Sequence, residues 1–392
     1  MKGEQHMKKV IHVQTAFLTQ ALAAAAIGNG KGFVLMVIPS MMQGEETVQG
    51  ALLGSSDGER MGRCVFEITC TGFEKSETYY PTKSLMKVAA TLAKVTDRIE
   101  IEVKESYLEL SAEDGTSRVK VPLNTTDLMF DVPDEESKTA VFFNMKTDDF
   151  AKVIHCGAFP TLKAEQQFRA VYFSIKENSF ATVSYCNSCM AKAELHAVEV
   201  ANPSTEEKWH TVDDAFIRAV VSNLRGEMIR ISLTDKYIVI TDSEGAFYAS
   251  KKLITKISMG LLKQLEPGEE EYSATCQKKA LLLGIEVAIV GLEDAGCVRI
   301  QTNDDGTVKI SSKLGENSMD VIQTDHEGNM EESCLGVETF RNVLQSAGET
   351  IRYHGMNSGS QKSLIHFEGS DGNVSFHSII TKIKGVKKES DS

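Results

Sequence analysis

The residues with the clearest potential for chemistry are two cysteines at metal-ligand spacing, Cys186-Asn-Ser-Cys189. A structural zinc ion needs four ligands, and neither a second CxxC nor an HxxxH motif accompanies this pair. The eight cysteines are too sparse for a small disulfide scaffold, so we expect reduced thiols. Single histidines, without a GxSxG, P-loop or HExxH motif, stand at His12, His155, His196 and His210. The sequence therefore predicts that the protein is not an enzyme and binds no metal or cofactor.

A second group of residues is suited to bind phosphate. Lys83, Lys87 and Lys94 stand at i, i+4 and i+11 on a helix expected over residues 82–95. This spacing places them within about 40° of one another around the helix axis. The opposite face carries apolar residues that would pack on a sheet: Leu85, Val88, Ala89 and Leu92.

Other expected helices carry basic residues as well. Arg218 and Arg225 share a face of the helix expected over residues 211–225. Further basic residues occupy helical positions at Lys152, Lys278, Lys279 and Arg341. Lysines on the wet face of one helix are common, but here they recur in a chain of net charge −13. We therefore predict a basic inner surface that binds the phosphates of double-stranded DNA without reading its bases.

These helices belong to a pattern that occurs three times: a helix, then three strands, with a polar hairpin turn before the last. The turns contain Gly115, Gly245 and Gly372, which are 130 and 127 residues apart, a spacing typical of domains. Alternating polarity and β-branched residues indicate the strands. The expected helices and strands cover residues 82–95, 97–103, 107–110 and 118–121, then 211–225, 227–233, 237–240 and 247–249, then 337–347, 349–353, 363–367 and 374–376.

Each copy also has a first half of similar design. Its expected helices cover residues 15–27, 147–158 and 275–290, and the strands after them cover 33–38, 169–175 and 297–302. The Gly- and Ser-rich stretch Gly44–Gly58 is predicted to be a long loop. Prolines followed by acids, at Pro133 and Pro267, mark linkers. The sequence therefore predicts an α+β fold of three domains, 1–137, 138–267 and 268–392, each built from two βαβββ units.

The composition is typical of a globular chain, with 42% hydrophobic and 25% charged residues. No run reaches the roughly 18 apolar residues that a membrane span requires. The apolar segment Ala21–Ile27 follows Lys8 and Lys9, as in a secretory signal, but polar residues such as Gln20 interrupt the approach to it. We therefore expect a helix there, and a cytoplasmic protein without membrane contact.

The order of elements resembles that of the bacterial DNA polymerase III β subunit, the sliding clamp, over nearly the whole chain. The resemblance lies more in the order and residue pattern of the elements than in any short sequence motif. Its segments are Phe168–Ser174, Ala181–Ser184, Ile229–Leu233, Ala249–Leu253, Val298–Ile300, Val308–Ser311 and Val374–Ile380.

The resemblance implies a specific assembly. Members of this family are head-to-tail homodimers whose six domains form a ring, with helices lining a central hole and antiparallel sheets outside. It implies a DNA sliding clamp, or processivity factor, that encircles double-stranded DNA and tethers a DNA polymerase. A clamp loader would place the ring on DNA, and the basic residues named above would face the hole.

Family members bind partners in a hydrophobic cleft between the second and third domains, where this chain departs from the family pattern. Residues 185–190 and 377–382 replace the family's Thr-Asp-Gly-His-Arg-Leu and Val-Val-Met-Pro-Met-Arg runs. Met190, Ile379 and Ile380 are the remaining apolar candidates for lining the cleft; the alternative is that they are core residues. Together with the polar tail Lys384–Ser392, this departure suggests a specialised clamp, for example of a phage or plasmid, with partners of its own.

Two other interpretations remain open at this point. A clamp-shaped scaffold or decoy would bind replication proteins without encircling DNA. A monomer would need a different partner to close a ring.

Overall fold

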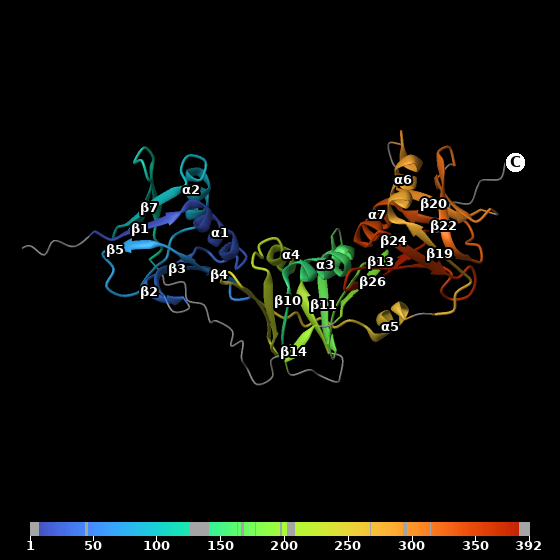
Figure 1. The fold of residues 1–392 in the computed structure, drawn as a ribbon, viewed down its shortest axis with the longest axis horizontal. Helices are drawn as coiled ribbons and strands as arrows, with labels where there is room; N and C mark the ends of the chain where they lie inside the picture. Colours follow the sequence, from blue (N-terminus) through green and yellow to red (C-terminus); the bar gives the residue numbers. More distant parts are fainter. Residues whose placement is uncertain are drawn as a thin grey trace, which may run out of the picture. The chain divides into compact units, whose positions relative to one another are not determined.

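The computed structural model describes residues 8–43, 46–125, 141–162, 164–165, 168–176, 178–196, 198–201, 208–266, 268–292, 296–303, 305–313 and 315–383. Contacts divide the chain into two compact units, one formed by Met1–Thr147 with Ala215–Lys252 and the other by Asp148–Asp214 with Leu253–Ser392. Each unit combines antiparallel sheets with helices (Figure 1). Among the described residues, no helix is both long and apolar enough to cross a membrane.

The first unit contains a five-stranded sheet in the order β5-β1-β7-β8-β9 and a longer sheet in which its strands run β10-β16-β17-β18-β4-β3-β2-β6. The pairing of β18 with β4, with Ala246 opposite Cys64, joins segments far apart in the chain. Its elements are β1 Val10–Gln14, α1 Thr15–Ala26, β2 Val34–Gln43, β3 Glu46–Ser56, β4 Arg60–Glu67, β5 Thr69–Thr71, β6 Glu77–Tyr79, α2 Ser84–Leu92, β7 Arg98–Val103, β8 Tyr107–Ala112, β9 Arg118–Pro122, β10 Val141–Lys146, α4 Asp214–Val221, β16 Met228–Leu233, β17 Tyr237–Asp242 and β18 Ala246–Lys251.

The second unit is built on a twelve-stranded sheet in the order β15-β11-β12-β13-β26-β25-β24-β19-β22-β21-β20-β23. The pair β13–β26 makes this sheet continuous, with Met190 opposite Ile379. Its elements are α3 Thr147–Ala158, η1 Phe159–Thr161, β11 Ala170–Lys176, β12 Ser179–Tyr185, β13 Cys189–Leu195, β14 Glu199–Ala201, β15 Lys208–Asp213, α5 Met259–Leu262, η3 Lys263–Leu265, β19 Tyr272–Gln277, α6 Lys278–Ile289, β20 Cys297–Thr302, β21 Thr307–Ser312, β22 Ser318–Glu327, β23 Ser333–Gly336, α7 Val337–Ser346, β24 Thr350–Gly355, β25 Leu364–Asp371 and β26 Val374–Thr381.

The predicted βαβββ units are present, because a strand leads directly into most helices and three antiparallel strands follow. The strand that precedes a helix can also pair with a strand of the next unit. Strand β1, before α1, pairs with β7, after α2, and β19, before α6, pairs with β24, after α7. Two successive units are thus joined by exchanged strands. This architecture confirms the predicted α+β class.

The hairpin turns behave as their sequences predict. Gly115, Gly245, Gly306 and Gly372 have φ values of +69°, +88°, +80° and +62°. This left-handed region is open to glycine without the steric cost that a Cβ imposes. The repeat of acidic-Gly pairs therefore marks equivalent turns.

The predicted loop Gly44–Gly58 is wrong, since β3 occupies Glu46–Ser56 and pairs with both β2 and β4. Helix α1 packs on β3 and β4, and small residues permit the close approach. A Cβ added at Gly62 on β4 would lie 2.2 Å from the carbonyl oxygen of Ala24. One added at Gly28, just after α1, would lie 1.8 Å from that of Ser55 on β3. Within the stretch itself, Ser55 Oγ accepts from Gly30 N and donates to Gly32 O, both at 3.0 Å, which ties β3 to the segment after α1.

Helix positions were predicted well, and helix starts less well. Helix α3 covers the predicted residues 147–158, whereas the first residues assigned to the helices at 211 and 275 belong to strands β15 and β19. The predicted linkers at Pro133–Glu136 and Pro267, and the tail Lys384–Ser392, lie outside the described residues. The domain boundaries near 137 and 267 therefore stay predictions.

Candidate nucleic-acid-binding helices and partner cleft

Helix α2 exposes lysines on one side and buries apolar residues on the other, as predicted. Leu85, Ala89 and Leu92 are buried, while Lys83, Lys87 and Lys94 are exposed. One correction concerns Lys94, because α2 ends at Leu92 and Lys94 lies in the following turn. None of these three lysines forms an ion pair with another described residue.

The predicted pairing of Arg218 and Arg225 on one helix is wrong. Helix α4 ends at Val221, and its last carbonyl groups accept hydrogen bonds from side chains that follow: Ser222 Oγ donates to Arg218 O at 3.0 Å and Asn223 Nδ2 to Ala219 O at 2.8 Å. Such side-chain bonds compete with continuation of a helix. Arg225 instead donates to the side chain of Gln20 on α1.

The remaining basic residues differ in how they are engaged. Lys152 on α3 forms an ion pair with Asp371 at 3.3 Å, and Arg341 on α7 is half-buried. Lys278 Nζ donates to the carbonyl oxygen of Ala347, just past α7, at 2.6 Å. Lys279 beside it is exposed and has no ion pair with a described residue. Lys83, Lys87, Lys94 and Lys279 are therefore the strongest candidates for phosphate contact.

Two of these lysines lie where helix electrostatics disfavours a cation. Lys83 is the N-cap of α2 and Lys279 lies in the first turn of α6, and neither first turn contains an acid. A cation at the positive end of a helix costs about 0.3–1 kcal/mol at an exposed site. The same arrangement concentrates positive potential from side chain and backbone, which attracts phosphate.

The candidate cleft residues do not line one surface. Met190, Ile379 and Ile380 are all buried, with exposed fractions of 5%, 3% and 1%. Met190 and Ile379 are cross-strand neighbours, but Ile380 pairs with Cys189 and points to the opposite face of the sheet. The predicted three-residue lining therefore needs correction: Ile380 belongs to the other side.

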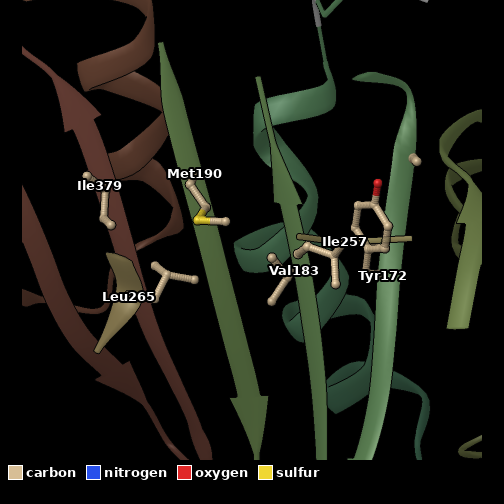
Figure 2. Packing of buried hydrophobic residues seen from close by; sticks show 7 residues of the cluster. Tyr172, Val183, Met190, Ile257, Leu265 and Ile379 are labelled. Atoms are coloured by element: carbon tan, nitrogen blue, oxygen red, sulfur yellow. The ribbon is translucent and has the colours of Figure 1, made fainter. Parts of the chain in front are cut away.

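Met190 and Ile379 form part of an apolar cluster on β11, β12, β13 and β26. Its other buried members are Ala170, Tyr172, Val183, Ile257 and Leu265. Figure 2 shows Leu265 between Ile379 and Met190, and Ile257 near Val183 and Tyr172. The segment around α5 and η3 thus covers this face of the sheet, with Met259 of α5 exposed at 62%.

The two cysteines of the CxxC motif lie together without a metal-site geometry. Their Sγ atoms are 3.5 Å apart, and among the described residues no third Cys, His or acid completes a metal-binding group with them. The thiol of Cys189, followed by the hydroxyl of Ser188, stabilises a thiolate at Cys186 and lowers the pKa of Cys186 to about 5.

This local environment predicts an unusual pH profile for thiol alkylation. Cys186 is expected to react with iodoacetamide at a rate that is already near its plateau at pH 7, because the thiolate is the nucleophile. Mass spectrometry of peptides after timed alkylation across pH 4 to 9 measures this profile. Replacement Cys189→Ser removes the thiol partner and should move the inflection upward; an inflection near that of an ordinary thiol in the unsubstituted protein contradicts the prediction.

Three histidines that were not among the residues predicted from the sequence, His354, His366 and His377, converge in the second unit. A signal was present, because the turn at Gly372 fixes the β25–β26 register and places His366 and His377 close together. The third histidine, on β24, requires knowledge of strand order.

The fold is similar to that of solved sliding clamps over nearly its whole length. A DNA polymerase sliding clamp from Bacillus subtilis superposes with a TM-score of 0.78 at 12% identity, covering 97% of this chain and 100% of that chain. The DNA polymerase III subunit beta from Borrelia burgdorferi gives 0.76 at 16% identity, covering 96% and 99%. That from Pseudomonas aeruginosa gives 0.74 at 16% identity, covering 96% and 100%. The fold is therefore that of the sliding clamps.

The sequence itself is distant from known families. No protein-family model and no curated protein matches it. The likeness thus lies in backbone architecture, which agrees with the resemblance of pattern drawn from the sequence.

Proposed function

We propose that the protein is a DNA sliding clamp that encircles duplex DNA and tethers a DNA polymerase. The observation that carries this proposal is the agreement of the entire chain with structures described as sliding clamps, with no large part of either chain left over. A clamp acts by position and not by a chemical step of its own. Retention on DNA then depends on a closed ring, so affinity for any one site stays low.

The distribution of charge supports this function. The chain carries a net charge of −13. Even so, exposed lysines that form no ion pair with a described residue lie on or beside α2 and at the start of α6: Lys83, Lys87, Lys94 and Lys279. Lysines that meet phosphates release counterions and give affinity that depends on salt and not on base sequence. Such contacts permit sliding along DNA.

The proposal includes specific partners. A second copy of the chain would complete the ring, and a clamp loader and a DNA polymerase would act with it in the cytoplasm. Strand β9 forms one edge of the five-stranded sheet, and Val119 on it is 38% exposed. An edge with no further neighbouring strand among the described residues is suited to pairing with a strand of another chain.

Threading onto linear DNA tests encirclement directly. Duplex DNA is fixed to beads at one end and incubated with the protein at a concentration where sedimentation shows a species of about twice 43.0 kDa. The free end is then capped with a bulky protein. We expect the protein to survive washing on capped DNA and to be released when a restriction enzyme removes the cap, because only topology retains it.

The control is DNA whose free end is never capped, from which the protein should leave during the same wash. Equal retention on capped, uncapped and cut DNA would show ordinary binding and contradict the clamp. A scaffold that does not encircle DNA would be absent from all three.

A further inference from the structure

Three histidines lie side by side on adjacent strands of the twelve-stranded sheet. His354 on β24 is directly opposite His366 on β25, and their rings stack with centroids 4.9 Å apart. His366 Nδ1 lies 2.9 Å from Nε2 of His377 on β26. One possible ligand atom from each of the three lies within 4.8 Å of the other two.

A carboxylate lies beside the group. Glu368 is the cross-strand partner of His377. Its Oε1 lies 3.3 Å from His354 Nε2 and 3.9 Å from His377 Nδ1. The cluster therefore offers three imidazoles from three neighbouring strands, with a carboxylate beside them, and the sheet register fixes their positions.

The spacing of these atoms matches a tetrahedral metal site. Bonds from zinc to nitrogen or oxygen of about 2.0–2.2 Å, at tetrahedral angles, place neighbouring ligand atoms about 3.3 Å apart. The closest separation between two ligand nitrogens here, 2.9 Å, lies near that value, and all three nitrogens lie within 4.8 Å of one another. We propose that His354, His366 and His377 bind a divalent transition metal ion, with zinc as the best match to three imidazole nitrogens and a fourth position open to water.

The surroundings of His354 orient it for this role. Its Nδ1 lies 3.2 Å from Glu270 Oε1, and a proton on Nδ1 leaves the lone pair on Nε2 for a metal. That Nε2 is buried, and its one near polar neighbour among the described residues is Glu368 Oε1 at 3.3 Å, which forms no well-aligned hydrogen bond with it. A carboxylate on the far nitrogen of a histidine is a common outer contact in metal sites.

The charges around the cluster also favour a cation. Glu270 and Glu368 bring two negative charges, and Arg352 contributes one positive charge at 3.2 Å from Glu270 and 3.4 Å from Glu368.

A bound ion would connect more than the three strands. His377 makes a hydrogen bond with the backbone of Leu265, and Leu265 packs beside Ile379 (Figure 2). The metal would thus hold η3 against the apolar cluster of β11, β12, β13 and β26. This role is separate from the encirclement of DNA.

Metal titration of the full chain tests the proposal. Protein stripped with EDTA and dialysed is titrated with ZnCl2 against a chromophoric chelator, and separately with CoCl2. We expect one Zn2+ per chain. The Co2+ complex should show the intense visible bands of tetrahedral geometry without the near-ultraviolet absorption of a thiolate ligand. Replacement His366→Asn should weaken binding at least about 100-fold, and Glu270→Gln about 10–100-fold as an orienting residue.

Matched variants decide where the metal sits. His326→Asn changes an exposed histidine, and Cys186→Ser removes one thiol of the CxxC pair; both should bind as the unsubstituted protein does. His377→Gln, at a partly exposed ring, provides a second ligand variant if His366→Asn does not fold by circular dichroism. Failure of the unsubstituted protein to bind in a saturable manner, or loss of binding in Cys186→Ser with retention in the histidine variants, would overturn the proposal.

Discussion

Replacement of Lys83, Lys87 and Lys94 by glutamate is expected to weaken binding to duplex DNA by about tenfold or more at low salt. All three side chains are exposed and form no ion pair with another described residue, so the change removes available cations without breaking internal contacts. Each lysine that meets a phosphate also contributes to the salt dependence of affinity. The slope of log K against log salt should fall by about 1 for each lysine engaged.

Fluorescence anisotropy with labelled duplex DNA over a range of NaCl concentrations measures both quantities. The matched control reverses three exposed lysines elsewhere, Lys236, Lys256 and Lys313, which produces the same change in net charge. If binding and salt slope fall equally in both triple variants, the effect is one of overall charge and α2 has no special part. Both variants should stay folded, with stability changed by about 1 kcal/mol or less, because most of the substitutions are exposed and only Lys83 lies at a helix N-cap, where an acid is favoured over a cation.

The sequence predicted the elements well where local pattern determines them. The hairpin glycines, the strands on either side of them and helix α3 all follow from alternation and turn chemistry that act over a few residues. Strand β3 could not be found in this way. Its small residues have low strand propensity, and its place in the sheet depends on pairing with β2 and β4 and on packing with α1, which local pattern does not show.

In the candidate site, too, local pattern predicted some features, and contacts between distant segments determined the others. That α2 carries lysines on its wet face could be predicted from helical periodicity. Two other contacts depend on which segments lie together and could not be predicted in this way. Lys278 donates a hydrogen bond to the carbonyl of Ala347, and Arg225 donates one to Gln20. The histidine cluster depends on strand order in the same way, since β24 and β26 lie on either side of β25.

The second large effect concerns stability, and it is expected from truncation of Met190 or Ile379, two of the residues first considered for a partner cleft. Replacement Ile379→Ala or Met190→Ala is expected to cost about 2–5 kcal/mol of unfolding free energy, because each leaves a cavity in a packed cluster. Met259→Ala is the control, since that side chain is 62% exposed and its loss should change stability by about 0.5 kcal/mol or less. Urea unfolding monitored by circular dichroism measures the shifts, with EDTA present so that bound metal does not alter the adjoining strands.

The double variant separates a core from an open cleft. Met190 and Ile379 face each other across β13 and β26, so their truncations share one cavity and their costs should differ from a simple sum by about 0.5–3 kcal/mol. Side chains that line an open cleft would give small, additive losses, because solvent would fill the space. Small and additive costs would therefore place these two residues on a binding surface and remove them from the core.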